Sequence, residues 1–184
     1  MSQRNKPKII QKTILAESAL FTIEGLHLHF SNGEERCYER IAGKTHGSVL
    51  IIPLLDKDTL LLIREYGGGV EDYVLAFPKG AIDFKEDLLT TANRELMEEV
   101  GYGAKKITWL TRVSASPGYM ASMMDIVLAE ELYPKKIEGD EPEEIEVIPW
   151  KLDKIDELLR HPEFHEARSQ AALLWLLRRK MHAS

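Results

Sequence analysis

Three glutamates in one short segment have the spacing expected of a metal site. Glu95 and Glu99 are four residues apart, so a helix would place their carboxylates one turn apart on the same side. Two such carboxylates repel each other, and a bound cation would remove that repulsion. Oxygen ligands of this kind suit Mg²⁺ or Mn²⁺ and not zinc. The pair predicts a site for a hard divalent cation, although a solvated acidic helix face would contain the same residues.

A helix must carry these glutamates, and the surrounding residues predict one. The expected helix starts near Asp87 and ends at Gly101, a residue type that often ends helices. One apolar stripe at helical spacing should face the core. The stripe consists of Leu89, Ala92, Leu96 and Val100. Glu98 lies further round the helix, with Arg94 four residues before it.

The complete spacing from Gly80 to Tyr102 resembles the Nudix box. The pattern of that family is G-x5-E-x7-R-E-U-x-E-E-x-G-U, in which U is a bulky apolar residue. Every fixed position is matched, from Gly80 through Glu86 and Arg94 to Gly101. Tyr102 stands where an aliphatic residue is more usual. The resemblance implies an α/β sandwich around a mixed sheet, and an enzyme that hydrolyses a diphosphate linked to another moiety.

The resemblance also implies a role for each residue of the box. Glu95 and Glu99 would hold Mg²⁺, with Mn²⁺ as the other choice, and Glu98 would hold the metal or its bound water. The backbone carbonyl of Lys79 would be a further ligand. Structural roles would fall to Gly80, Glu86 and Arg94, with Glu86 as the partner of Arg94.

A second acidic segment follows at residues 135–145, KKIEGDEPEEI. Its carboxylates belong to Glu138, Asp140, Glu141, Glu143 and Glu144. Alone, such a run indicates a solvated loop. In the ADP-ribose pyrophosphatase branch of the Nudix family, a loop of this kind supplies a glutamate that activates water or completes the metal shell, and a box glutamate is the other choice for activating water. By that resemblance Glu143 is the first choice for the catalytic base and Glu141 the second.

Residues outside the box indicate the substrate. Pro117 resembles a mark of the ADP-ribose branch, and Tyr119 resembles a mark of dinucleoside polyphosphate hydrolases. Together they imply ADP-containing substrates: ADP-ribose, diadenosine diphosphate or triphosphate, and NADH. Hydrolysis of ADP-ribose would release AMP and ribose 5-phosphate. Arg64, at the end of an expected strand, is a further candidate for substrate contact.

The chain before residue 46 is expected to form a small N-terminal β subdomain, residues 1–45. Leu26, Leu28 and Phe30 alternate with polar residues, and the turn at residues 31–33 predicts a hairpin. So small a unit must pack on the main domain, residues 46–184, or on another subunit. In related enzymes it is exchanged between the subunits of a homodimer and forms part of the adenine site. Phe21 would stack on adenine or pack within the hairpin, and Arg40 would contact phosphate or ribose or form a surface ion pair.

The remaining elements must build the sheet that positions the box. Strands are expected at 48–55, 59–66, 73–77, 107–113, 124–129 and 145–148. Helices are expected at 152–160 and 164–181, the latter with Ala171, Leu174, Trp175 and Leu177 facing the core.

Composition excludes several classes of protein. The net charge of −6 over 184 residues argues against a nucleic-acid-binding surface. Cys37 is the single cysteine, so an intrachain disulfide is impossible and a cytoplasmic location is expected. The longest apolar run, residues 49–55, is too short to span a membrane. The histidines lack the spacing of a zinc site.

Other functions remain open. A nucleoside diphosphate-sugar pyrophosphatase, such as a GDP-mannose hydrolase, would share the box. A non-catalytic nucleotide-sensing module would share the fold but often lacks box carboxylates. A triphosphate-sanitising enzyme would lack the N-terminal unit, and a zinc-ribbon NADH pyrophosphatase would need four cysteines. A purely structural role leaves the box unexplained.

Overall fold

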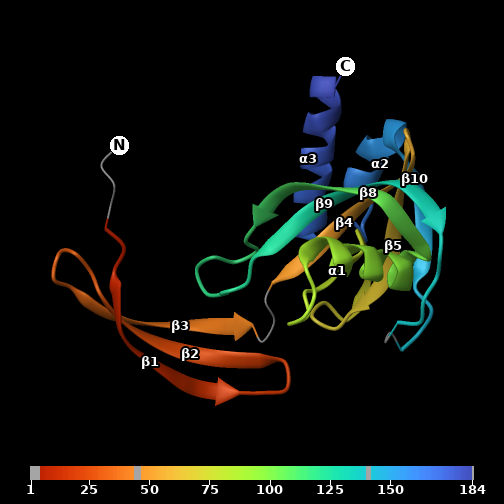
Figure 1. The fold of residues 1–184 in the computed structure, drawn as a ribbon. Coiled ribbons are helices and arrows are strands. Elements are labelled where there is room, and N and C mark those ends of the chain that lie inside the picture. The colour runs from red at the N-terminus through yellow and green to blue at the C-terminus, as the bar shows by residue number, and fades with distance from the viewer. Residues whose placement is uncertain (1–4, 44–46, 140–141, 184) are drawn as a thin grey trace.

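The protein contains two separate β-sheets, with helices on both faces of the larger one (Figure 1). The computed structural model describes residues 5–43, 47–139 and 142–183. The smaller sheet comprises the first three strands and extends away from the rest of the molecule (Figure 1). Among the described helices, none is long and apolar enough to cross a membrane.

The N-terminal sheet is antiparallel, in the order β1-β2-β3. Its strands are β1 (Lys8–Glu17), β2 (Phe21–His29) and β3 (Glu35–Gly43). Leu26 and Leu28 are buried, as their alternation predicted. Gly33 adopts a φ of 86° in the turn between β2 and β3, a conformation that glycine reaches without strain. Every residue of β1 is exposed, so this sheet leaves much of its surface without an intrachain partner.

The seven-stranded sheet is mixed, as the sequence predicted. Its main path runs β10-β5-β4-β9-β8, with β6 paired to β5 and β7 paired to β4. Only β4 and β9 are parallel among the described pairs. The strands are β4 (Ser48–Asp56), β5 (Thr59–Gly67), β6 (Asp72–Ala76), β7 (Lys79–Ala81), β8 (Tyr102–Val113), β9 (Met124–Pro134) and β10 (Glu146–Lys151). The short strand β7 was not expected, and β8 and β9 are longer than their apolar runs indicated.

Alternate residues of β4 face two separate apolar cores. On one face lie α1 (Leu88–Glu95) and the π-helical turn η1 (Leu96–Val100). On the other lie η2 (Leu152–Lys154), α2 (Ile155–Leu159) and α3 (Ala167–Ala183). The core beside α1 includes Val49, Ile51, Ala92, Leu96 and Val100. The core beside α3 includes Leu50, Ile52, Leu158, Leu173 and Leu176. This arrangement is the expected α/β/α sandwich.

Two expectations about helix faces were wrong. Leu89 is 48% exposed, and its neighbour Leu88 packs on the α1 core instead. Leu174 is 67% exposed, whereas Leu173 and Leu176 are buried. In both helices consecutive leucines are present, so apolar spacing alone could not select which of the two faces the sheet.

Candidate active site

Five residues of the Nudix-like pattern line one acidic cleft of about 660 Å³: Gly80, Arg94, Glu95, Glu98 and Glu99. We call it the box cleft. The strands β5 and β7 supply one side, and α1 with η1 supplies the other. Its acidic lining residues are Glu65, Asp83, Glu95, Glu98, Glu99 and Glu138. Its basic lining residues are Lys79 and Arg94.

The helix that carries the glutamates is fixed at both ends. The Asp87 carboxylate accepts hydrogen bonds of 2.9 Å from the backbone N–H groups of Leu89 and Thr90. These bonds hold the pKa of Asp87 below its ordinary value, and the bond from the Thr90 backbone N–H has the largest effect. Gly101 ends the helix with a φ of 77°. The second half is π-helical and not α-helical as expected, so Glu98 and Glu99 lie on a widened turn.

Gly80 allows Glu95 to lie directly against the backbone of β7. A Cβ atom added at Gly80 would stand 1.9 Å from the Glu95 carboxyl carbon, far inside van der Waals contact. Glu95 is only 8% exposed and Glu99 only 7%. The glycine therefore leaves the space that the Glu95 carboxylate occupies.

Arg94 connects three of the glutamates. Its guanidinium donates to Glu86 at 3.1 Å and to Glu98 at 2.7 Å, and it forms an ion pair with Glu95 at 2.9 Å. Burial acts to lower the pKa of Arg94, but these carboxylates raise it above its ordinary value. Glu86 also accepts a bond from the Thr91 hydroxyl. Arg94 is thus positioned to orient the box.

Glu99 is a buried acid of the cleft with a strongly raised pKa. Burial raises its pKa to about 8, and the Lys79 ammonium is the main group that opposes this effect. The Lys79 backbone N–H also donates to Glu99 at 3.0 Å, while its Nζ lies 3.0 Å from Glu65. The charge of Lys79 does not offset the cost of burying the Glu99 carboxylate, so a further positive charge nearby would stabilise its ionised form.

The donor set of the cleft fits a hard divalent cation, because it consists of carboxylate oxygens. In the described part of the chain, however, no three His, Cys, Asp or Glu side chains are already arranged as a metal shell. Glu95 and Glu98 instead contact Arg94, and Glu99 contacts Lys79. Arginine and lysine therefore balance part of the charge that a metal would balance.

The acidic segment expected to supply the base lies beside this cleft. Glu143 accepts a 2.8 Å hydrogen bond from the Tyr73 hydroxyl, which raises the pKa of Tyr73. Glu143 shares a neighbouring cavity with Glu98 and Glu99 but does not line the box cleft itself. Glu141, the second choice, lies outside the described residues.

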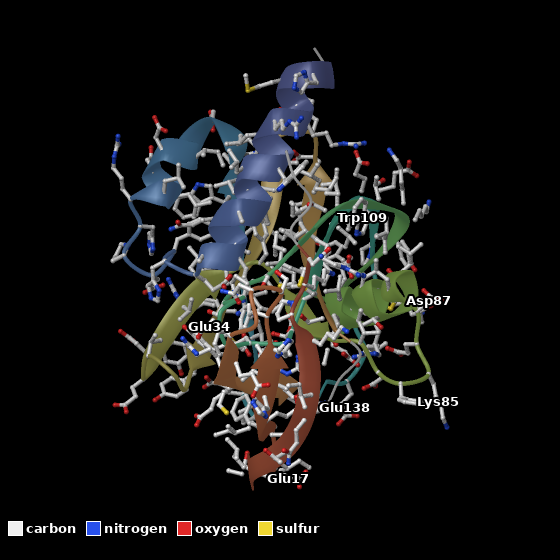
Figure 2. All side chains as sticks on the ribbon, turned by 90° about the vertical axis from the view of Figure 1, so that its left-hand side faces the viewer. Glu17, Glu34, Lys85, Asp87, Trp109 and Glu138 are labelled. Atoms are coloured by element: carbon white, nitrogen blue, oxygen red, sulfur yellow. The ribbon has the colours of Figure 1, made fainter. Side chains whose placement is uncertain are left out.

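Glu138 does line the box cleft, although the sequence did not single it out. Its side chain is labelled in Figure 2. Like Glu143, it belongs to the acidic run, and spacing along the chain could not show which of these carboxylates faces the box. Glu65, which follows Arg64 on β5 and was the weaker of these two candidates for substrate contact in the sequence, lines the box cleft as well.

Family models match nearly the whole chain. Residues 44–176 match the NUDIX domain, and residues 7–40 match the NudE-type Nudix hydrolase N-terminal domain. The chain is a Nudix hydrolase. Enzymes of this family generally use divalent metal ions.

Two curated relatives and one solved structure resemble this Nudix hydrolase over most of their length. The ADP compounds hydrolase NudE of Escherichia coli (strain K12) is 48% identical over 168 residues, which cover 91% of this chain and 90% of that protein. An ADP-ribose pyrophosphatase of Bacillus subtilis (strain 168) is 28% identical, with 92% and 94% covered. A crystal structure of an ADP compounds hydrolase superposes with a TM-score of 0.91 at 42% identity, covering 100% of this chain and 99% of the other.

Arg64 lies near the acidic segment but is already engaged. It donates to Glu163 and Glu146, each at 2.7 Å, and these bonds raise its pKa. Together with Tyr73 and Glu143 it lines a cavity of about 420 Å³. In this Nudix hydrolase Arg64 therefore joins β5 to β10 and to the segment before α3.

Arg40 lines a cavity of about 500 Å³ between the N-terminal sheet and the main domain. It donates to the buried Glu24 at 2.8 Å, and Lys12 pairs with the same carboxylate. The bonds from Lys12 and then Arg40 hold the pKa of Glu24 below its ordinary value. Arg112 and Ser122 line the opposite, main-domain side of this cavity.

The other residues expected to contact substrate are exposed. Phe21, at the start of β2, is 52% exposed, and Tyr119 is 59% exposed. Pro117 is exposed in the same loop as Tyr119. The Tyr119 carbonyl accepts a 2.7 Å bond from the N–H of Ile41, so this loop docks on β3. None of the three side chains lines the box cleft.

Proposed function

We propose that this Nudix hydrolase cleaves the pyrophosphate bond of ADP-linked compounds. Its substrates would be ADP-ribose, diadenosine diphosphate or triphosphate, and NADH, with AMP and ribose 5-phosphate released from ADP-ribose. The observation that carries the proposal is the 48% identity to an ADP compounds hydrolase over 91% of the chain. The presence of Glu95, Glu98 and Glu99 in one cleft supports a catalytic role and not only nucleotide binding.

The box residues would hold Mg²⁺, or Mn²⁺ in its place. Glu95, Glu98 and Glu99 supply the carboxylates, and the Lys79 carbonyl is the proposed backbone ligand. A divalent cation there would supply positive charge to the phosphate oxygens of the substrate. Arg94 keeps the three glutamates oriented, and Gly80 leaves the space that Glu95 occupies.

Glu143 is the proposed general base. A water molecule would attack phosphorus, its proton would pass to the Glu143 carboxylate, and the bond from phosphorus to the bridging oxygen would break. The position of Glu143 beside Glu98 and Glu99 supports this role. Glu141 is the second choice, and Glu138 is a third carboxylate that a test should include because it lines the cleft.

The substrate's adenosine would lie toward the N-terminal sheet. The cavity that contains Arg40 has positive side chains from both sheets, which suits a ribose or phosphate group. Phe21 and Tyr119 offer exposed aromatic rings for adenine, and Pro117 shapes the loop that presents Tyr119. Arg64 would contact substrate only after leaving one of its two glutamate partners.

The proposal includes a homodimer that exchanges N-terminal sheets. Large apolar side chains cover β1 and the start of β2, where a monomer would leave them in water. They are Ile9, Ile10, Ile14, Leu15, Leu20 and Phe21, each more than half exposed. We also infer a cytoplasmic location, supported by the single cysteine, Cys37, and no nucleic-acid or membrane partner, supported by the net charge of −6.

A substrate panel tests the proposal. Purified enzyme with Mg²⁺ is offered ADP-ribose, diadenosine triphosphate, NADH, GDP-mannose and a nucleoside triphosphate, and the products are separated by chromatography. AMP release from the adenylated diphosphates is the expected result. A preference for GDP-mannose would contradict the proposal, and calorimetric binding of ADP-ribose without turnover would indicate a nucleotide-sensing module.

A further inference from the structure

The box cleft has a surplus of negative charge, yet its proposed substrate is also an anion. Among the described residues, six acidic side chains line the cleft against two basic ones. A diphosphate entering it would gain from direct contact with a protein cation, in addition to any bound metal. The question is which of Lys79 and Arg94 can make that contact.

Arg94 is fully committed to the protein. Its guanidinium contacts Glu86, Glu95 and Glu98 at distances from 2.7 to 3.1 Å. A planar guanidinium with three carboxylate partners has little remaining capacity for a ligand, and moving it would release the box glutamates. We therefore assign Arg94 to holding the box glutamates in position and not to binding the substrate.

Lys79 has a fixed backbone but a side chain with fewer described partners than that of Arg94. Its backbone is fixed, because its N–H donates to Glu99 and because β7 pairs with β4. Its ammonium, by contrast, has one described ion pair, to Glu65 at 3.0 Å, and Glu65 is 42% exposed. A partly exposed ion pair contributes little to stability, so the flexible lysine side chain can exchange Glu65 for another oxygen at small cost.

We propose that the Lys79 ammonium binds a phosphate oxygen of the diphosphate substrate, and that Glu65 holds it ready in the free enzyme. This role belongs to the side chain and is separate from the ligand role proposed for the Lys79 carbonyl. It rests on the proposed function, since it requires a diphosphate in the box cleft.

The same location has a second consequence. In the free enzyme Lys79 lines the same cleft as the carboxylates that would bind a divalent cation, and its charge acts on Glu99. The ammonium would therefore repel that cation. Removing its charge should therefore change the affinities for metal and for substrate in opposite directions. A general distortion of the cleft would weaken both.

The test compares Lys79→Met with Lys79→Arg, and with Lys85→Met as a matched control. Lys85 is an exposed lysine on the loop after β7 that does not line the cleft (Figure 2). Mn²⁺ binding without nucleotide is measured by electron paramagnetic resonance, and ADP-ribose hydrolysis is measured with Mg²⁺. We expect Lys79→Met to bind Mn²⁺ about threefold to tenfold more tightly and to lose about tenfold or more in kcat/KM. Lys79→Arg should stay close to the wild type in both, and Lys85→Met should change neither.

Weaker Mn²⁺ binding together with weaker catalysis in Lys79→Met would assign Lys79 a structural role and overturn the proposal. Unchanged kcat/KM in that variant would overturn it as well. Failure of the proposed function has a different signature, because the wild type would then hydrolyse no ADP compound. The metal-binding arm uses no substrate and would still show whether the ammonium competes with a cation.

Discussion

The Tyr73 hydroxyl donates a 2.8 Å hydrogen bond to Glu143, across 70 residues of sequence. Tyr66 supports the ring of Tyr73 in an edge-to-face contact at 5.7 Å. Two ion pairs flank this bond, Lys136 with Glu144 and Arg64 with Glu146. The strand pair β5–β6 therefore determines where the proposed base lies in the free enzyme.

Replacing Tyr73 by phenylalanine should alter kcat more than KM. The change removes one hydrogen bond to a charged acceptor and keeps the ring, so kcat should fall by about threefold to tenfold. Steady-state kinetics with ADP-ribose measures it. In a Glu143→Gln background the same replacement should have no further effect. Tyr66→Phe is the control, and an equal loss in that variant would show that ring packing, and not the bond to Glu143, is responsible.

Glu99→Gln should lower kcat by at least about a hundredfold while the protein stays folded. Glutamine keeps the shape of the buried side chain but removes the anionic oxygen proposed to bind the cation. Circular dichroism checks the fold, and Mn²⁺ titration checks the metal. Glu144→Gln, an exposed carboxylate in the acidic segment, should keep wild-type turnover. Near-normal activity of Glu99→Gln would remove Glu99 from the proposed metal ligands.

Gly80→Ala should inactivate the enzyme by displacing Glu95. The added methyl would stand 1.9 Å from the Glu95 carboxyl carbon, so the carboxylate or β7 must move. We expect kcat/KM to fall at least about a hundredfold, with a lower melting temperature. Gly68→Ala is the matched control, because a Cβ there has no neighbour within 4 Å. A fully active Gly80→Ala enzyme would show that Glu95 need not keep this position.

Glu166→Gln should destabilise the protein near neutral pH. Glu166 accepts bonds from Arg168 and from the backbone and hydroxyl of Ser169, whose oxygen accepts from the Phe77 N–H. Burial acts to raise the pKa of Glu166. The hydrogen bond and charge of Arg168, together with the hydrogen bonds from Ser169, outweigh this effect and hold the pKa below its ordinary value of 4.5. The loss on substitution should be about 1–3 kcal/mol.

The pH dependence follows from the depressed pKa of Glu166. A carboxyl with a lower pKa in the folded state stabilises the protein above its unfolded pKa, and the benefit disappears as pH falls through the folded pKa. The wild type and Glu166→Gln should therefore differ at pH 7 and converge well below pH 4.5. Thermal unfolding across that range measures the difference. Glu157→Gln, an exposed carboxylate, should match the wild type throughout.

Ile14→Asp should convert the proposed dimer to a monomer. Ile14 is 67% exposed on β1, so an intrachain core does not depend on it, but a charge there would be buried in a dimer. Light scattering during size exclusion measures the mass. Leu174→Asp is a control of equal exposure on α3 and should remain a dimer. A monomeric wild type would end the proposal of exchanged sheets.

The positions that the sequence predicted best are those of the box, where the expected chemistry requires particular residue types at particular spacings. Gly80, Arg94 and the box glutamates could be placed on one helix and loop because their spacing has few other solutions. Strands β4 and β5 were found because both are buried runs. Contacts between distant segments could not be predicted, since Tyr73 with Glu143 and Arg64 with Glu163 depend on how the sheet edges meet.

The sequence also could not predict which of two similar neighbouring residues is buried. Leu88 and Leu89 are equally apolar, and only the docking of α1 on the sheet decides which one is buried. The π-helical turn was hidden for the same reason, because its residues would also form a regular α-helix. Glu138 and Glu143 are chemically alike, so the fold alone distinguishes the one that lines the cleft.

Successive residues of β4 pack into different cores, so different side chains of one strand support the box helix and the C-terminal helices. Val49 and Ile51 support the helix of the box, whereas Leu50 and Ile52 support the C-terminal helices. Substitutions in the second set should change thermal stability through a core that contains no residue of α1 or η1. Thermal stability can thus be altered at positions of β4 that do not pack beneath the helix of the box.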